Sequence, residues 1–242
     1  WDSITKKIKQ LAAILGNSTT NIHGSIESIK TLNIKRKRII KSASAKTYLP
    51  AKILESNYSS AQKQRWIIYC DNMTQLEKVK EDLKSKKFDC MEYHSSIKED
   101  TQKEILDRLE TLGGILLAIK CLDEGVDIPS LSHAIILASS LNPREFIQRR
   151  GRVLRTSPST GKTFATIFDA LVVPENLTSD ENSQQSIARG EIARSIQFSK
   201  SSINQSDHES LLDISDQIGF DYTKLIEEDS EEDSDIEEPL GY

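Results

Sequence analysis

Short apolar runs joined by amphipathic stretches fill residues 62–174, and this pattern constrains the fold more than any other feature. The runs do not alternate with polar residues, which is typical of strands that are buried on both faces of a parallel sheet. Helices between such strands cover both faces. We therefore predict an α/β fold, a parallel sheet sandwiched between helices, with strands at 65–70, 88–93, 115–119, 133–138 and 162–168.

Capping residues indicate where the intervening helices begin. Asp71 or Asn72 is expected to cap the helix that follows the first strand. Ser96 and Glu99 have the spacing of a capping box, so a second helix is predicted to start at Ser96. An asparagine followed by proline at 142–143 has the preferred order for a third helix start.

An arginine-rich segment follows the fourth predicted strand. If it is helical, Gln148, Arg152 and Arg155 lie on one face at i, i+4 and i+7. Arginine suits a multiply charged phosphate because its planar fork donates in pairs and keeps its charge. Gly151 would let a neighbouring backbone approach. A generic basic surface patch is the alternative, but such a patch requires neither the glutamine nor the glycine.

The loop at 120–129 follows the third predicted strand and lies at the edge where parallel sheets bind ligands. Gly125 permits a tight turn close to a ligand, and Asp127 can accept from ribose hydroxyls or hold an arginine. Pro129 fixes the exit of the loop. Alone, this segment is equally consistent with an ordinary turn; together with the arginine segment it favours a phosphate-directed site.

These two segments, in this order, resemble the fifth and sixth motifs of superfamily 2 helicases. The arginine segment carries the pattern Q-R-x-G-R-x-x-R, and residues 115–129 resemble the branch of restriction-enzyme motors and DNA-repair helicases. Residues 66–72 and 93–96 resemble neighbouring motifs. The resemblance covers about 46–173 and extends weakly over 189–198, and it implies a RecA-like fold with helical extensions at both ends.

The resemblance also implies roles for the arginine segment. In this family a second lobe supplies arginine fingers to ATP that is bound by a first lobe. By motif position, Arg152 and Arg155 would be those fingers. Gln148 would face the γ-phosphate or the attacking water. Arg149, which belongs to the same nucleotide-binding set, would hold the motif in place.

Further roles follow for residues at the ends of the strands. Gly125 and Asp127 would approach the phosphate and sugar of the nucleotide. Lys120, and the backbone near Asn72 and Ser95, would contact nucleic-acid phosphates. No metal ligand is predicted in this chain.

The sequence departs from a complete motor of this family. It contains neither a G-x-x-x-x-G-K-[ST] loop nor an acidic D-E-x-x box. Residues 159–163 imitate the end of such a loop, but Gly161 is predicted to form a hairpin-like turn into the last strand. We expect ATP and Mg²⁺ to serve the full-length protein, with the magnesium ligands outside this chain, and we expect the isolated chain to be inactive.

Composition divides the chain into four zones. Residues 227–238 carry nine acidic side chains and no basic one, so without them the net charge of −5 becomes +4. A run of this kind cannot bury enough apolar surface to order itself. The predicted zones are a helical extension at 1–61, a helicase C-terminal RecA-like domain at 62–174, a helical extension at 175–225 and an acidic disordered tail at 226–242.

Several classes of protein are disfavoured. The three cysteines form no C-x-x-C pair, and no apolar run approaches the ~18 residues of a membrane span. A reducing, cytoplasmic compartment is expected, and the first residue, Trp1, suggests a piece of a longer chain. The predicted function is the second motor lobe of an ATP-dependent DNA helicase or translocase, with DNA and the missing lobe as partners. An RNA helicase lobe and a non-catalytic nucleic-acid-binding module remain as alternatives.

Overall fold

The computed structural model separates the chain into two compact units, one of residues 41–170 and one of residues 1–40 together with 171–242. Each unit is described by itself. The structure describes isolated positions before residue 43 and around residue 152, and the continuous stretches 43–119, 128–137, 155–172, 182–200 and 202–217.

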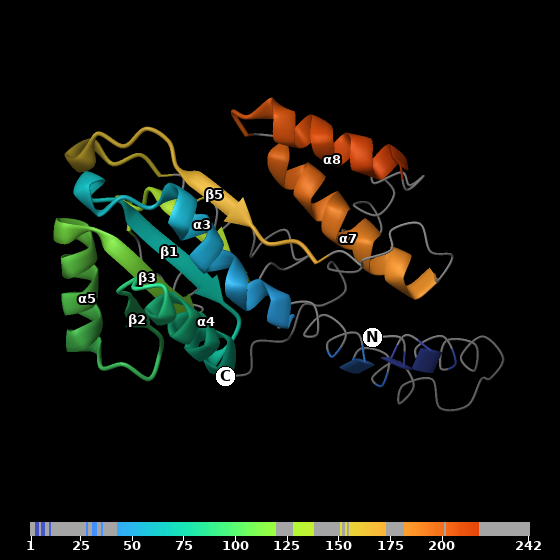
Figure 1. The fold of residues 1–242 in the computed structure, drawn as a ribbon, viewed down its shortest axis with the longest axis horizontal. Helices are drawn as coiled ribbons and strands as arrows, with labels where there is room; N and C mark the ends of the chain where they lie inside the picture. Colours follow the sequence, from blue (N-terminus) through green and yellow to red (C-terminus); the bar gives the residue numbers. More distant parts are fainter. Residues whose placement is uncertain are drawn as a thin grey trace, which may run out of the picture. The chain divides into compact units, whose positions relative to one another are not determined.

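Five parallel strands form the centre of the 41–170 unit in the order β2-β3-β1-β4-β5 (Figure 1). This confirms the predicted α/β architecture, and the first strand has the predicted bounds. Ile68 of the central strand pairs with Leu117 on one side and Ile135 on the other. The strands are β1 (Arg65–Cys70), β2 (Met91–Tyr93), β3 (Gly114–Ile119), β4 (His133–Ile136) and β5 (Thr166–Asp169).

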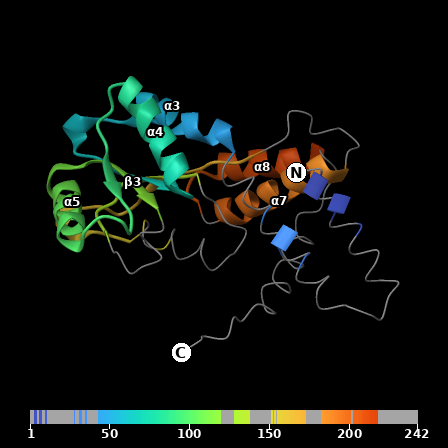
Figure 2. The ribbon, with the colours of Figure 1, turned by 90° about the horizontal axis from the view of Figure 1, so that it is seen from below.

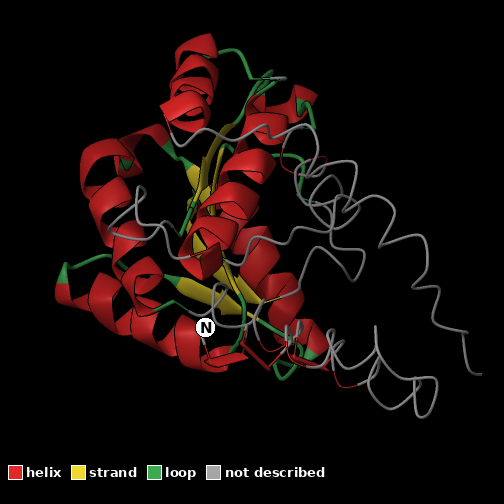
Figure 3. Ribbon diagram, turned by 90° about the vertical axis from the view of Figure 1, so that its right-hand side faces the viewer, coloured by secondary structure: helices red, strands yellow, loops and turns green. Residues whose placement is uncertain are grey.

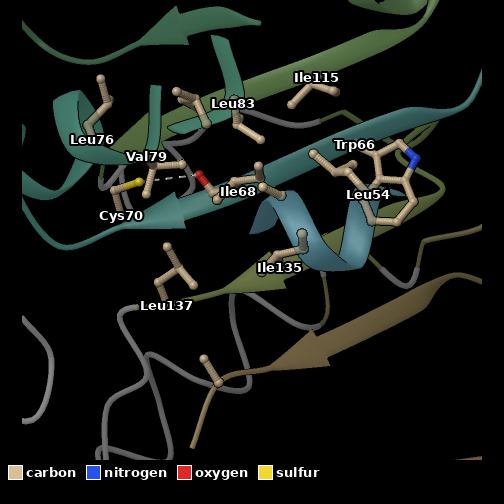
Figure 4. Close-up of a cluster of buried hydrophobic side chains, with 13 residues drawn as sticks. Leu54, Trp66, Ile68, Cys70, Leu76, Val79, Leu83, Ile115, Ile135 and Leu137 are labelled. Atoms are coloured by element: carbon tan, nitrogen blue, oxygen red, sulfur yellow. Dashed lines mark hydrogen bonds between the residues drawn. The ribbon is translucent and has the colours of Figure 1, made fainter. Parts of the chain in front are cut away.

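Helices α3 (Leu49–Asn57) and α4 (Met73–Ser85) cover one face of the sheet (Figure 2). Leu54 of α3 and three residues of α4 pack against the β1 side chains that point to this face, as Figure 4 shows. The short helix η1 (Ser44–Tyr48) precedes α3, and its buried Lys46 donates from Nζ to the carbonyl of Leu137, just past β4, over 3.0 Å. The α4 residues are Leu76, Val79 and Leu83.

The opposite face is covered by α5 (Glu99–Leu112), by the segment 128–131 and by Val153. Leu109, Leu131 and Val153 are fully buried against the alternate side chains of β1, β3 and β4. Figure 3 shows strands between helices. Burial on both faces explains why the strand sequences are continuously apolar.

The predicted cap of α4 is confirmed, whereas the predicted capping box is wrong. Asn72 accepts from the backbone N–H of Gln75 at 3.0 Å. The helix α5 starts at Glu99, not at Ser96, and its N-cap residue makes no side-chain capping bond. The backbone N–H of Ile97 instead donates to the carbonyl of His94 at 3.1 Å. The chain therefore still turns at 94–97, and the N-cap position falls on Lys98 instead of Ser96.

Three strands are shorter than predicted. The strand predicted at 133–138 ends at Ile136, where Leu137 forms a bend. Residues 88–90 precede β2 in an irregular connection, because the N–H of Phe88 donates to Leu83 at the end of α4 and Lys87 has a φ of 63°. Residues 162–165 precede β5, because Ser157 and Lys162 form an antiparallel bridge. Gly161 has a φ of 68° in this turn, so the predicted hairpin-like turn is confirmed. The short helices η2 (Ser60–Gln62) and η3 (Pro158–Thr160) lie in connections.

In the other unit, helices α7 (Asn182–Ser199) and α8 (Gln205–Gln217) pack against each other. Ile192 and Ile196 of α7 are buried against leucines and an isoleucine of α8. None of the described helices is long and apolar enough to span a bilayer. The predicted third helix at 142 and the acidic tail at 226–242 lie outside the described residues.

Candidate functional site

The carboxyl ends of the five parallel strands lie along one edge of the sheet. Strands β3 and β4 are the two neighbours of β1, so the segments that leave Cys70, Ile119 and Ile136 start from adjacent strands. The 120–129 loop and the arginine segment follow β3 and β4 respectively. The topology therefore starts both predicted ligand loops at the edge where open α/β sheets bind ligands.

A polar helix start follows β1 at this edge. Asn72 caps α4 and donates from its amide to a carboxylate oxygen of Asp71 at 2.9 Å. The backbone N–H of Asp71 donates to the side chain of Gln75 at 2.8 Å. The side chain of Asn72 is thus committed to the helix, which agrees with a predicted nucleic-acid contact through backbone rather than through side chain. A helix N-terminus favours negative charge such as phosphate.

The segment after β2 is held by a glutamine. Gln102 of α5 donates to the carbonyl of His94 at 3.0 Å and accepts from the Tyr93 hydroxyl at 3.2 Å. Ser95 lies exposed in the turn that these bonds fix. The structure thus places two predicted nucleic-acid residues, Asn72 and Ser95, at the carboxyl ends of β1 and β2.

The end of the arginine segment is fixed by one buried side chain. Val153 is completely buried in the core on the α5 face, while Arg155 is exposed. Gly151 is exposed, and a Cβ built on it meets no heavy atom within 4 Å among the described residues. The expectation that Gly151 makes room for a neighbouring backbone stays a prediction, because most residues next to Gly151 lie outside the described ones.

Six of the nine predicted site residues lie outside the described residues. Their roles stay predictions. They are Lys120, Gly125, Asp127, Gln148, Arg149 and Arg152.

Sequence reasoning missed a lysine that connects the two ligand segments. Lys162 donates from Nζ to the carbonyl of Pro129 at 2.8 Å and to the carbonyl of Val153 at 2.6 Å. The sequence placed this lysine in a decoy of a phosphate loop and at the start of a strand. Two convergent backbone acceptors from distant segments leave no signal in a single sequence.

The thiol next to the site is not a nucleophile. Burial, with smaller contributions from the nearby Cys90 and Asp71, raises the pKa of Cys70 to about 12. A thiol with so high a pKa stays protonated at neutral pH, and only the thiolate is reactive. Cys70 is therefore not a candidate nucleophile for this edge of the sheet.

The matched family decides what these segments are. Residues 45–157 match the family described as helicase conserved C-terminal domain. This segment is similar to the C-terminal lobe of superfamily 2 helicases, and its parallel sheet between helices is consistent with a RecA-like fold. We call the compact unit of residues 41–170, which contains the matched segment, the helicase lobe. The match begins in η1 and ends two residues beyond Arg155, so it includes both predicted ligand segments.

Two curated proteins are similar to this chain. One is a DEAD-box ATP-dependent RNA helicase 22 of Arabidopsis thaliana, 26% identical over 99 residues, which are 41% of this chain. The other is a type I restriction enzyme EcoKI endonuclease subunit of Escherichia coli K12, 26% identical over 142 residues, which are 53% of this chain. The aligned segments span only 17% and 12% of these relatives.

A solved structure, the C-terminal part of the Fun30 ATPase domain, is also similar to the chain. It is 13% identical, and the alignment covers 88% of this chain and 74% of that one with a TM-score of 0.48. The assignment of the fold rests on the parallel sheet and on the two helical layers of the helicase lobe.

Proposed function

We propose that the chain is the second motor lobe of an ATP-dependent DNA helicase or translocase. In this proposal Arg152 and Arg155 donate to the γ-phosphate of ATP that is bound chiefly by a first lobe. Gln148 faces that phosphate or the attacking water, and Arg149 holds the segment in place. Because motors of this type act within cells, we place the protein in the reducing, cytoplasmic compartment.

One observation carries the proposal. The matched helicase domain extends through the arginine segment, and Val153 anchors that segment in the core while Arg155 stays exposed. A buried residue between two arginines allows the guanidiniums to reach a ligand outside the lobe. Neutralising the charge that develops on a transferred phosphoryl group can contribute about 10³ to 10⁵ in rate.

The nucleotide and its metal are shared between two lobes in this proposal. Gly125 and Asp127 approach the phosphate and ribose from the second lobe. Magnesium supplies charge neutralisation when it is bound, and its ligands come from the acidic box of the first lobe. Within the described stretches, no three His, Cys, Asp or Glu side chains gather closely enough to hold a metal ion.

Nucleic acid binds along the same edge in this proposal. Lys120 and the backbone near Asn72 and Ser95 contact phosphates, which carry no base sequence information. The similarity to a restriction-enzyme subunit and the L-D-E-G-V-D-I-P segment favour DNA. An RNA helicase lobe is the second candidate, and the similarity to a DEAD-box RNA helicase favours it.

The test uses the full-length protein with its first lobe. ATP hydrolysis is measured without nucleic acid and with single-stranded DNA, duplex DNA or RNA. We expect Arg155→Ala and Arg152→Ala each to lower kcat by about 10³-fold. Binding of a fluorescent ATP analogue should stay within about threefold, because the first lobe supplies most of the nucleotide contacts.

Arg108→Ala is the matched control, because Arg108 is an exposed arginine of α5. Its kcat should stay within about twofold of the parent. The proposal is wrong if either arginine-segment variant keeps parental kcat. Stimulation by RNA but not by DNA would replace the DNA motor with the RNA helicase, and nucleic-acid binding without any ATP hydrolysis would favour the non-catalytic binding module.

A further inference from the structure

The ammonium group of Lys162 connects two segments that are distant in sequence. It donates to the carbonyl of Pro129, at 2.8 Å, and to the carbonyl of Val153, at 2.6 Å. Pro129 comes two residues after Asp127, and Val153 comes directly after Arg152. The ammonium of Lys162 therefore binds the backbone close in sequence to Asp127, the predicted ribose ligand, and to Arg152, a predicted arginine finger.

A tight turn between Ser157 and Lys162 orients the Lys162 side chain. The N–H of Ser157 donates to the carbonyl of Lys162 at 3.0 Å, and the N–H of Lys162 donates back to Ser157 at 3.1 Å. Ser157 is buried, and Gly161 supplies the left-handed residue that closes the turn. Two backbone hydrogen bonds thus hold Lys162 in this turn, in addition to the bonds that its side chain makes to the two carbonyls.

Both acceptors lie beside the core of the same face. Ile128 and Leu131, on either side of Pro129, are buried in the cluster that also contains Val153. A hydrogen bond from an ammonium to a carbonyl is shorter and stronger than one between neutral groups. The ammonium of Lys162, which extends from the turn at 157–162, thus connects the backbone at Pro129 with the backbone at Val153.

We propose that Lys162 is a positioning residue that sets the relative placement of the loop at 120–129 and the arginine segment. This inference rests on the proposed function, because it concerns how one nucleotide meets both segments. A displacement of about 1 Å in a reacting group can lower a rate by about 10²-fold. Lys162 touches no reacting atom in this proposal and acts only through the two carbonyls.

The test compares three variants of the full-length protein. Lys162→Met removes the ammonium but keeps the length of the apolar stem. Lys162→Arg keeps a charged group that can donate to two acceptors. Lys78→Met is the matched control, because Lys78 is exposed on α4, which covers the opposite face of the sheet.

We expect Lys162→Met to lower kcat for ATP hydrolysis by about tenfold or more, while KM for ATP changes by less than about threefold. Lys162→Arg should recover most of the kcat, and Lys78→Met should behave as the parent. A purely structural role would instead lower the melting temperature and the active fraction together, with unchanged kcat per folded molecule. Parental kcat in folded Lys162→Met overturns the proposal.

A second readout does not depend on hydrolysis. Hydrogen exchange is measured on peptides that contain Pro129 or Val153. Exchange should accelerate in both peptides of Lys162→Met and in neither peptide of Lys78→Met. Unchanged exchange in Lys162→Met overturns the positioning role. If exchange accelerates in Lys162→Met but the parent protein hydrolyses no ATP, only the proposed function is overturned.

If Lys162→Met does not fold, Lys162→Gln is the variant that tests the proposal. The glutamine side chain is one bond shorter than that of lysine, so its amide cannot reach both carbonyls. A kcat below the parent's, with accelerated exchange in one of the two peptides, supports the proposal. Parental kcat and parental exchange in Lys162→Gln overturn it.

Discussion

A stack of aromatic rings on neighbouring strands is centred on Trp66, near the amino end of β1. Trp66 of β1 stacks on its register partner His133 of β4, with ring centroids 4.2 Å apart and an interplanar angle of 7°. Phe168 of β5 stacks on Trp66 at 5.9 Å. The hydroxyl of Ser132 lies 2.8 Å from Nδ1 of His133. Aromatic pairs of this kind stabilise cores beyond their buried area.

This stack predicts how stability depends on pH. Burial lowers the pKa of His133 in the folded state below its ordinary value of 6.5. The unfolded state therefore binds more protons between the two pKa values, and stability falls as the pH drops through 6.5. Thermal melts of the parent and of His133→Phe between about pH 7.5 and pH 5 measure this effect. The variant should lose less stability on acidification; equal losses would show that His133 does not contribute.

Gly113 and Gly161 both have a left-handed backbone, but they differ in the atoms that an added Cβ would contact. Gly113 ends α5 with a φ of 77°, and an added Cβ would lie 2.8 Å from backbone atoms of Lys63 and Gln64. Gly161 has a φ of 68°, but a Cβ built on it meets no heavy atom of the described residues within 4 Å. Gly161→Ala should cost about 1 kcal/mol from its left-handed backbone alone, and Gly113→Ala should cost clearly more because of the clash. Denaturant unfolding gives the order, and equal costs would contradict it.

At the scale of the elements, apolar runs and turn signals predicted the sheet but not its details. Residues 65–70 are apolar enough to have only one interpretation, and the strand has those bounds. Ser96 and Glu99 have capping-box spacing, yet the turn between His94 and Ile97 and the bonds of Gln102 determine the helix start. Local spacing cannot reveal this, because the competing partners come from tertiary contacts.

Only part of the candidate site could be predicted from the sequence. The motifs predicted which segments form it, the loop and the arginine segment, because residue type and order carry that information. The bonds of Lys46 to Leu137 and of Lys162 to Pro129 and Val153 were not predicted. A lysine that is bound to backbone carbonyls looks like any surface lysine in a sequence, because its acceptors have no identity of their own.

The N-cap of α4 offers a test that separates stability from binding. Asn72→Ala removes the oxygen that accepts from Gln75 and should cost about 1 kcal/mol. Asn72→Ser keeps an accepting oxygen and should cost only a few tenths of that. Because the predicted nucleic-acid contact is through backbone, Asn72→Ser should bind nucleic acid with parental affinity. Denaturant unfolding and fluorescence anisotropy measure the two effects, and weak binding by Asn72→Ser would assign the contact to the side chain.

At the scale of the whole molecule, the helicase lobe is a scaffold with half of a proposed site. Its core binds the sheet to helices on both faces, and the two ligand segments leave one edge. The sequence contains no phosphate-cradling loop and no acidic box that could bind the rest of a nucleotide. Arginine fingers accelerate hydrolysis only where another group holds the phosphates and the metal in place.

The isolated 242-residue chain should therefore hydrolyse ATP no faster than buffer does, with or without nucleic acid. The full-length protein should hydrolyse ATP in a nucleic-acid-dependent manner under the same conditions, measured by release of inorganic phosphate. A circular dichroism melt of the isolated chain shows whether it is folded, so that inactivity is not mistaken for unfolding. Turnover by the folded chain at a rate near that of the full-length protein would mean that this chain holds a complete nucleotide site, and the division of the site between two lobes would be wrong.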